Sequence, residues 1–400
     1  MIKIIVIYPK RLFGNIIAIA SLIMFAYIPT SINGRIFDDS VAVIILWGVT
    51  LGFSFILLFN GRISKKAFYL AAGVFAYMFF VTLFVLQTQI DVRFSIARIA
   101  PVAIFLFISS ITFRPCVSPK LMIFLLDFFC LSVIIWNIGI LLNVEFIITY
   151  TINNYSQFYS FATLGSLMRL KPVMSFSVHT FSSFFYAMIF VLCHITVKSL
   201  RNNRLYLYMF FLLLFTLMLR SSSSFVFFVF MLFMIFMSFR GKVKKLAFLS
   251  TIVFASLFLV QTPLFEEYIQ AFLSEYNGVI PRYLSGNSVF KDNIAILNES
   301  FIGIGFNIVQ SRYEIAYTDS GYILYLTMGS IVLLVGIYIM LVNFIKNNVQ
   351  LKYRGYVLIP ILLLEFAIPV IIYVKFFPFI VFVVYYLRSL ELPSENRNPR

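Results

Sequence analysis

Apolar residues run along this chain in long stretches that are separated by short polar connections. Most stretches are about 17 to 25 residues long, which is the length an α-helix needs to cross the hydrocarbon core of a bilayer. They lack the period-2 alternation of a membrane β-barrel strand. The pattern therefore predicts an all-α polytopic integral membrane protein with about twelve transmembrane helices. The predicted spans are 12–32, 41–59, 67–86, 94–112, 120–143, 178–197, 205–219, 223–239, 246–262, 320–344, 355–373 and 375–387.

Three of these spans are less regular than the others. The stretch that begins at residue 205 is short before Arg220 interrupts it, and only residues 373–375 separate the last two spans. Polar backbone at membrane depth is tolerated where it is buried in protein or lines a wet cavity. The last two spans are therefore predicted to be full crossings, a broken helix or a re-entrant pair.

The composition supports a membrane protein. Of 400 residues, 62% are hydrophobic and only 12% are charged, and 50 are phenylalanine. A soluble domain is about 45 to 50% apolar, so a cytosolic enzyme, a disordered chain and a small secreted domain are all disfavoured. The three cysteines stand apart without C-x-x-C spacing, so the sequence predicts neither a disulfide framework nor a zinc site.

The chain is strongly basic, with 31 Lys and Arg against 15 Asp and Glu and a formal net charge of +16. In a soluble protein this excess would suggest a nucleic-acid partner. Here the basic residues fall in short connections between apolar stretches, for example in 62–66, 198–204 and 240–245. The positive-inside rule explains that placement, so no nucleic-acid partner is predicted and both termini are expected in the cytoplasm.

Two connections are much longer than the rest, 144–177 and 263–319. The same orientation rule puts both of them on the periplasmic side. Long connections in a compact protein usually carry function. Since no internal repeat is visible, residues 1–400 are predicted to form a single membrane domain with its functional groups on these two loops.

Five arginines are expected at or near the periplasmic face, where the orientation rule alone would disfavour them. Arginine binds phosphate groups in a bidentate manner, which makes these side chains candidates for binding a diphosphate or a glycan. They are Arg98, Arg169, Arg220, Arg282 and Arg312.

Two of these arginines have a simpler alternative interpretation. Arg98 lies inside the fourth predicted span, where a charged side chain costs roughly 2.5 kcal/mol or more unless it faces a partner or a wet cavity. Instead of binding a ligand, Arg98 would then reach out to the outer headgroups. Arg220 begins the polar run Arg-Ser-Ser-Ser-Ser, and its alternative role is in a simple interfacial turn.

Three titratable side chains are candidates for a general base, namely Asp319, Glu299 and His179. His179 would titrate near neutrality, but it precedes an apolar helix and could simply be satisfied by backbone or water. Asp319 opens the tenth predicted span, where capping the helix is the alternative role. The sequence does not choose among the three. Glu365 and Lys375 are intramembrane charges for which pairing and packing in the bundle is the simpler interpretation.

The order of these features resembles the Wzy-type O-antigen polymerase family, within the wider polymerase and ligase group of bacterial surface polysaccharides. The resemblance covers roughly residues 90 to 345. It consists of Arg169 before a Ser/Pro-rich helix start, Arg220-Ser-Ser at a helix mouth, Phe301-Ile-Gly-Ile-Gly-Phe306 near the end of the second loop, and Thr318-Asp-Ser-Gly-Tyr322 at the start of the next helix. The G-x-G within the third motif lacks the remaining glycine of a dinucleotide site, so a tight turn is predicted there.

The resemblance implies a metal-independent glycosyltransferase of the bacterial inner membrane that uses no cofactor and works at the periplasmic face. Such an enzyme transfers the growing glycan from undecaprenyl diphosphate onto an incoming lipid-linked repeat unit. Its implied partners are these lipid-linked oligosaccharides, a chain-length regulator of the Wzz type and a flippase of the Wzx type. O-antigen ligases tend to carry His-Asn where this chain has Thr318-Asp319, which favours a polymerase.

Two other functional classes fit part of the pattern. A lipid-linked oligosaccharide flippase or another secondary transporter would also have about twelve helices, but would usually show internal repeats and uniformly short loops. A scaffolding membrane protein would need no cluster of arginines on the outer side. An O-antigen ligase is the nearest enzymatic alternative.

Overall fold

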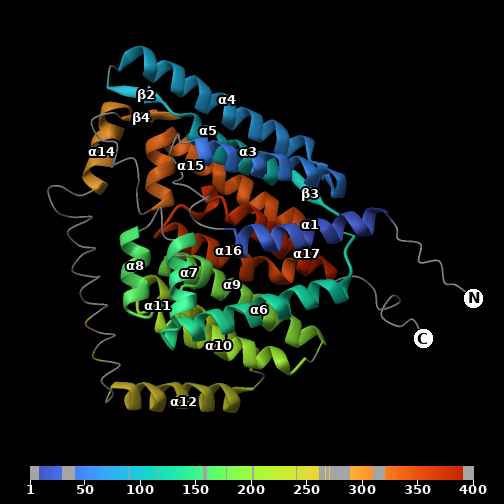
Figure 1. The fold of residues 1–400 in the computed structure, drawn as a ribbon. Coiled ribbons are helices and arrows are strands. Elements are labelled where there is room, and N and C mark those ends of the chain that lie inside the picture. Colours follow the sequence, from blue (N-terminus) through green and yellow to red (C-terminus); the bar gives the residue numbers. More distant parts are fainter. Residues whose placement is uncertain are drawn as a thin grey trace, which may run out of the picture. The chain divides into compact units, whose positions relative to one another are not determined.

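The computed structural model describes residues 9–28, 41–89, 91–114, 116–155, 160–176, 178–200, 202–239, 241–260, 266, 270, 289–309 and 320–390. It contains two compact units. Unit 1 comprises Met1–Ser132, Asn153–Phe158 and Asp292–Arg400, and unit 2 comprises Val133–Ile152 and Tyr159–Lys291. The first boundary between the units falls inside helix α6 (Figure 1), so no polar linker in the sequence marks it.

Each predicted span overlaps a helix, so the predicted helical character and the positions of the helices are confirmed. Among the described residues, four helices (α4, α6, α9 and α15) are long and apolar enough to cross a membrane. That twelve helices cross it stays a prediction. The helices are α1 (Pro9–Ala26), α3 (Val41–Ile56), α4 (Lys65–Thr88), α5 (Ile96–Ser109), α6 (Pro119–Leu141), α9 (His179–Leu200), α10 (Arg204–Met218), α11 (Ser222–Ser238), α12 (Lys242–Val260), α15 (Gly321–Asn348), α16 (Leu351–Glu365) and α17 (Phe376–Ser389).

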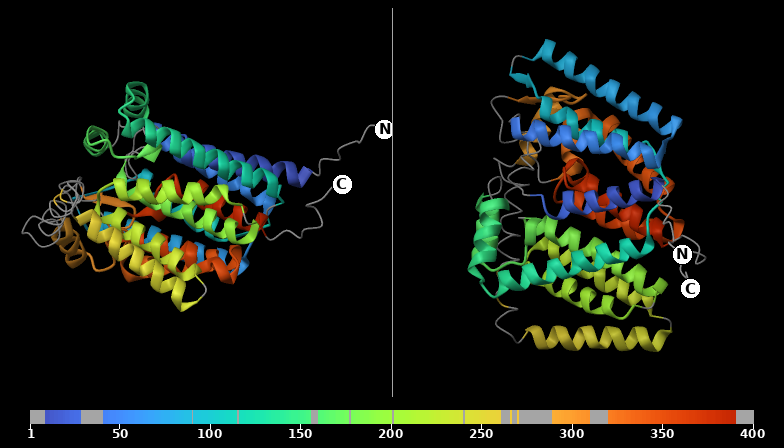
Figure 2. Two further views of the ribbon diagram at one scale, coloured as in Figure 1. Left: turned by 90° about the horizontal axis from the view of Figure 1, so that it is seen from below. Right: turned by 45° about the vertical axis from the view of Figure 1, so that its right-hand side comes forward.

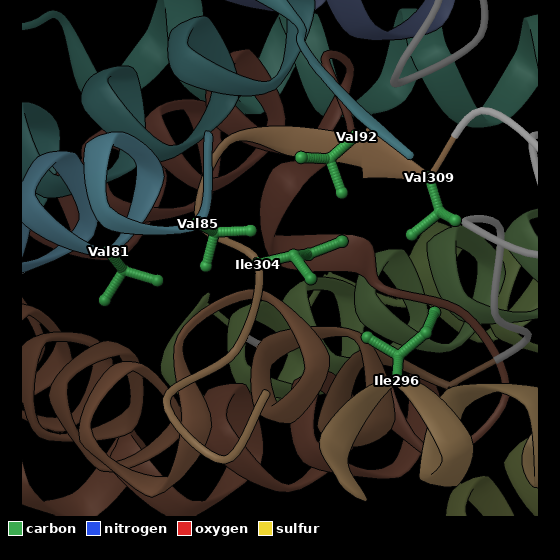
Figure 3. Close-up of a cluster of buried hydrophobic side chains, with 6 residues drawn as sticks. All are labelled: Val81, Val85, Val92, Ile296, Ile304 and Val309. Atoms are coloured by element: carbon green, nitrogen blue, oxygen red, sulfur yellow. The ribbon is translucent and has the colours of Figure 1, made fainter. Parts of the chain in front are cut away.

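In unit 1, α15 packs against α4 and α5, while α1 packs along α17. Two short antiparallel ladders join segments that are distant in sequence. Strand β1 (Gly61–Ile63) pairs with β3 (Ile111–Phe113), and β2 (Val92–Phe94) pairs with β4 (Asn307–Val309). A cluster of apolar side chains gathers around Ile304 beside the second ladder, and holds it against α4 (Figure 3).

The C-terminal end of α15 is fixed by polar side chains. The Asn348 amide accepts a hydrogen bond from the Phe113 backbone N–H at 2.6 Å and donates one to the Ile111 carbonyl at 2.9 Å, so it binds the edge of β3. Arg354 and Arg388 donate to the carbonyls of Val349 and Asn348, each at 3.0 Å. These contacts satisfy carbonyls that a helix end leaves without intrahelical partners.

In unit 2, helices α9, α10 and α11 pack side by side, and they stay together in the other two views (Figure 2). Helices α9 and α11 run parallel. Near their starts the Ser223 hydroxyl donates to the Thr180 hydroxyl at 3.3 Å, and near their ends the Ser238 hydroxyl lies 2.8 Å from Nε2 of His194. The N-terminal turns of α9 and α11 therefore lie next to each other.

The two long connections are not simple loops. The first contains α7 (Glu145–Tyr155), α8 (Ser160–Met168) and a 3-10 turn, η2 (Met174–Phe176), and the second contains α14 (Val289–Glu299) and β4. These helices have 9 to 11 residues. They were missed because a search for stretches of membrane-crossing length does not detect elements of about three turns.

The predicted span 355–373 consists of two elements. Helix α16 ends at Glu365, and a 3-10 turn, η4 (Val370–Ile372), follows Pro369. Proline cannot donate to a preceding turn and restricts the residue before it, so the helix stops short of it. The 15 residues of α16 and the 14 of α17 give helices of about 22 Å, shorter than a hydrocarbon core of about 30 Å.

Candidate functional site

The connection between α8 and α9 begins with two backbone hydrogen bonds that end α8. The Leu170 N–H donates to the Leu167 carbonyl at 2.9 Å, and the Lys171 N–H donates to the Ser166 carbonyl at 2.8 Å. Leu170 has a φ of 50°. This is the pattern that usually ends a helix with a left-handed glycine, here formed by a leucine.

Side chains of α9 hold the following segment in place. The Tyr186 hydroxyl donates to the Pro172 carbonyl at 2.7 Å and accepts from the Asn137 amide at 2.7 Å. The Ser182 hydroxyl donates to the Val173 carbonyl at 3.0 Å. All three side chains are buried. The segment is therefore anchored to the bundle rather than exposed as a free loop.

Lys171 links this segment to the turn between α10 and α11. Its side chain is only 5% exposed, and Nζ donates to the Arg220 carbonyl at 3.2 Å. Arg220 has a φ of 50° and directly precedes Ser221, which caps α11 through a reciprocal pair of bonds with Ser224. The lysine thus holds the left-handed turn that leads into α11.

Lys171 and Arg220 are thus in contact next to the start of α11, and His179 is the first residue of α9, whose first turn lies beside that of α11. Arg169 precedes Lys171 by two residues. We define the candidate anion site as Arg169, Lys171, His179 and Arg220 together with the first turns of α9 and α11. The first N–H groups of a helix lack intrahelical acceptors and carry a partial positive charge. With cationic side chains beside them, such termini bind phosphate groups.

The backbone of this region is also unusual. Leu170, Met174 and Arg220 all adopt a positive φ. Each non-glycine residue in this conformation costs of order 1–3 kcal/mol, and such residues concentrate at functional sites. The surrounding hydrogen bonds of Tyr186 and Lys171 are what make these conformations persist.

The sequence predicted three of the four side chains of the candidate anion site. Arg169 is exposed, and Arg220 and His179 are half-buried. The structure brings His179 and Arg220 to the same end of the unit 2 bundle. Lys171 was missed, although it lies two residues after Arg169, because only arginines were considered as phosphate ligands.

In unit 1, Arg98 makes a contact that the sequence did not predict. It lies in the first turn of α5, is 1% exposed, and donates from Nη1 to the Asn307 carbonyl. Asn307 in turn donates from its amide to the Thr82 carbonyl at 3.0 Å. The alternative in which Arg98 extends to the headgroups is wrong, because its guanidinium is buried against β4.

The Gly303-Ile-Gly305 motif forms the predicted tight turn, and its backbone packs against α15 where that helix is interrupted. Both glycines have positive φ, 88° and 65°. The N–H groups of Ile304 and Gly305 donate to the Thr327 and Met328 carbonyls at 3.0 and 2.7 Å. Helix α15 is interrupted just beyond, at 329–330. A Cβ on Gly303 would lie 2.6 Å from the Met328 carbonyl oxygen, so the contact requires glycine.

One of the four remaining predicted residues belongs to the described part of the chain. Glu299 is exposed at the end of α14 in unit 1. Asp319, Arg282 and Arg312 lie outside the described residues. In the part of the chain that is described, no three His, Cys, Asp or Glu side chains gather as metal ligands do.

Comparisons with protein-family models, with characterised proteins and with solved structures found no match to this chain. The resemblance to the Wzy-type O-antigen polymerases therefore stays a prediction from the motifs.

Proposed function

We propose that this protein is a surface-polysaccharide polymerase that transfers a growing glycan from undecaprenyl diphosphate onto a lipid-linked repeat unit. The candidate anion site carries the proposal. Its two helix N-termini and its cations Arg169, Lys171 and Arg220 suit a diphosphate.

The chemistry requires such a site. The acceptor hydroxyl oxygen attacks the anomeric carbon of the donor glycan, and the bond from that carbon to the diphosphate oxygen breaks. Negative charge then develops on the leaving diphosphate, and positioned cations and backbone N–H groups stabilise it. Arginine and lysine side chains supply this stabilisation from the protein itself.

The distribution of charge in unit 2 supports a periplasmic location for the candidate anion site. The end of α9, the start of α10 and the start of α12 carry Lys198, Arg204, Lys242, Lys244 and Lys245. The positive-inside rule puts these helix ends in the cytoplasm. The paired N-termini of α9 and α11 then face the side where lipid-linked repeat units are polymerised.

The acceptor hydroxyl needs a base to take its proton, and we propose Asp319 first, Glu299 second and His179 as the competitor. A positioned general base contributes typically 10²–10⁴-fold to the rate. Asp319→Asn keeps the capacity to cap a helix while removing the charge, so it separates the two roles. Normal polymer from that variant would assign Asp319 to capping and shift attention to His179.

Two experiments test the proposal. In cells, deletion of the gene should leave lipopolysaccharide with one repeat unit on its core, visible as a single band on a gel. With the full-length protein in nanodiscs, purified lipid-linked repeat units should be converted to polymer. Core without any repeat after deletion, together with no polymer in nanodiscs, would reject the polymerase.

A transporter is the second candidate, and the broken helix α15 is the observation that favours it. Discontinuous helices and buried charges such as Glu365 and Lys375 mark substrate paths in many secondary transporters. A flippase would move labelled lipid-linked repeat units across vesicle membranes, and its deletion would leave core with no repeat at all.

A further inference from the structure

A buried carboxyl group lies at the end of α16 in unit 1. Glu365 is 0% exposed, and its Oε1 accepts from the Ile371 N–H at 2.8 Å and from the Tyr325 hydroxyl at 3.4 Å. Oε2 accepts from the Tyr338 hydroxyl at 3.2 Å. A polar group is buried at low cost only when it is hydrogen-bonded in this way. Both carboxyl oxygens are thus used by specific donors.

The two tyrosines lie on opposite sides of the break in α15. Tyr325 belongs to the N-terminal half of the helix, residues 321–328, which we call the outer half. Tyr338 belongs to the C-terminal half, residues 331–348, which we call the inner half. At the break Gly329 and Ser330 have non-helical backbone angles, with φ values of −149° and 51°. A helix interrupted in this way does not fix the angle between its halves by its own hydrogen bonds.

The start of α15 fits closely against the same group. The Ser320 hydroxyl donates to the Glu365 carbonyl at 3.5 Å, and the Tyr322 hydroxyl donates to the Leu362 carbonyl at 3.1 Å. A Cβ on Gly321 would collide with Oε2 of Glu365. The outer half of α15 is therefore attached to the end of α16 by several contacts that converge on Glu365.

We infer that Glu365 is a positioning residue that fixes the angle between the two halves of α15. The carboxyl group accepts one hydrogen bond from a tyrosine hydroxyl of each half. A change in the angle between the halves would therefore break at least one of these two hydrogen bonds. The Gly303–Gly305 turn bonds to carbonyls of the outer half. The angle therefore also sets where residues 303–307 lie against Thr82 and Arg98.

For catalysis, this inference rests on the proposed polymerase function. Gly321, two residues after Asp319 in the sequence, packs against the carboxyl group of Glu365, so this side chain fixes the backbone close to the residue proposed as the base. Its loss should lower kcat, since displacing a reacting group by about 1 Å can reduce a rate roughly 10²-fold. Affinity for the lipid diphosphate, which we assign to unit 2, should not change.

Spin-label distances in the full-length protein test the positioning role directly. Labels at the partly exposed Ile323 and the exposed Val342 report on the two halves of α15, in a background where Cys116, Cys130 and Cys193 are alanine. We expect Glu365→Ala to broaden or shift the distance distribution. Glu365→Gln should leave it unchanged, because the amide can accept from Ile371 and donate to Tyr338.

Two further variants keep the test decisive if Glu365→Ala fails to fold. Tyr338→Phe removes one hydrogen bond to the carboxyl group and should broaden or shift the distance distribution as Glu365→Ala does. Tyr385→Phe removes a hydroxyl from another buried tyrosine of unit 1, outside this network, and should leave it unchanged. Unchanged distances in both Glu365→Ala and Tyr338→Phe, or a Glu365→Gln distribution as broad as that of Glu365→Ala, would overturn the inference.

A second arm measures polymer formation in nanodiscs. Glu365→Ala should lose kcat by roughly 10²-fold with unchanged affinity for undecaprenyl diphosphate, and Glu365→Gln should restore the rate to within about twofold of wild type. If the wild-type protein makes no polymer, the proposed function fails, while the spin-label distances still decide the role of Glu365. If affinity falls together with kcat, the effect is not one of position and the inference is wrong.

Discussion

Two segments with a left-handed backbone, one in each unit, are built from different residues. In unit 1 the segment inserted at the break of α15 turns at Gly303 and Gly305, and in unit 2 the candidate anion site turns at Leu170, Met174 and Arg220. Glycine adopts a positive φ without steric cost. A residue with a Cβ does so at a cost of roughly 1–2 kcal/mol.

The difference shows what each turn is for. The unit 1 turn is a packing contact, because added Cβ atoms would meet the backbone of α15 and α4. In unit 2 the side chains themselves are used: Met174 is fully buried, and Arg220 brings a cation to the start of α11. Backbone strain is tolerated there because a side chain is needed at that position. This comparison can be tested residue by residue.

The largest effect is expected for Gly305→Ala. Its Cβ would lie 2.7 Å from Cα of Thr82, at a φ that disfavours alanine, so overpacking and strain together should destabilise unit 1 by about 3 kcal/mol or more. The thermal unfolding midpoint in detergent should fall sharply. Gly48→Ala is the matched control, because a Cβ there meets nothing within 4 Å and alanine favours the helix. Equal midpoints for both variants would contradict a packing role.

Lys171→Met should give the next largest loss. The methionine fills a similar space but removes the bond from Nζ to the Arg220 carbonyl. Hydrogen bonds from charged groups contribute about 1.5–3 kcal/mol, so unfolding should be easier by about 2 kcal/mol. Lys244, exposed on α12, offers the control Lys244→Met, with an effect within about 0.5 kcal/mol. A stable Lys171→Met protein would show that the turn at Arg220 does not depend on this lysine.

Arg220→Gly separates the backbone from the side chain. Glycine relieves the strained φ, so the unfolding midpoint should hold or rise. The cation is lost, so affinity for undecaprenyl diphosphate should fall about tenfold, equivalent to about 1.4 kcal/mol. Lysine keeps the charge without the bidentate geometry, which makes Arg220→Lys an intermediate case. Unchanged binding in Arg220→Gly would remove Arg220 from the candidate anion site.

Helix positions could be predicted from the sequence because membrane helices leave a strong local signal. Each long run of apolar residues marked the position of a helix, and this includes the short run that forms α10. The pairing of distant segments left no such signal. The residues around Arg98 and around Asn307 in the sequence do not show that the Arg98 side chain donates a hydrogen bond to the Asn307 carbonyl beside the β2 and β4 ladder. Their contact depends on tertiary packing alone.

For the candidate site, residue type could be predicted but the use of each residue could not. Arg98 and Arg220 were equal candidates as arginines near the outer face. The structure uses the guanidinium of Arg98 to hold a backbone carbonyl, whereas Arg220 stays half-buried at a helix start. Glu365 was predicted to pair and pack within the bundle, and its carboxyl group accepts hydrogen bonds from Tyr325 and Tyr338, on the two sides of the break in α15. A charge in an apolar stretch indicates a partner, but the sequence does not name it.

The smallest expected effect is a gain of stability in Leu170→Gly. Leu170 occupies the left-handed position that ends α8, with a φ of 50°, and glycine is the residue that this position usually holds. Removing the strained Cβ should stabilise unit 2, offset in part by the more flexible unfolded chain and by the loss of a half-buried side chain. A net gain of about 0.5 kcal/mol, seen as a small rise in the unfolding midpoint, is expected. Gly165→Leu is not a suitable control, because Gly165 lies within α8. The comparison is therefore Leu167→Ala, which truncates a buried side chain of the same helix. This variant should destabilise unit 2 by roughly 2–5 kcal/mol. If Leu170→Gly loses stability as Leu167→Ala does, the leucine side chain packs well enough to outweigh its strain, and Leu170 joins Met174 as an anchor of the candidate anion site.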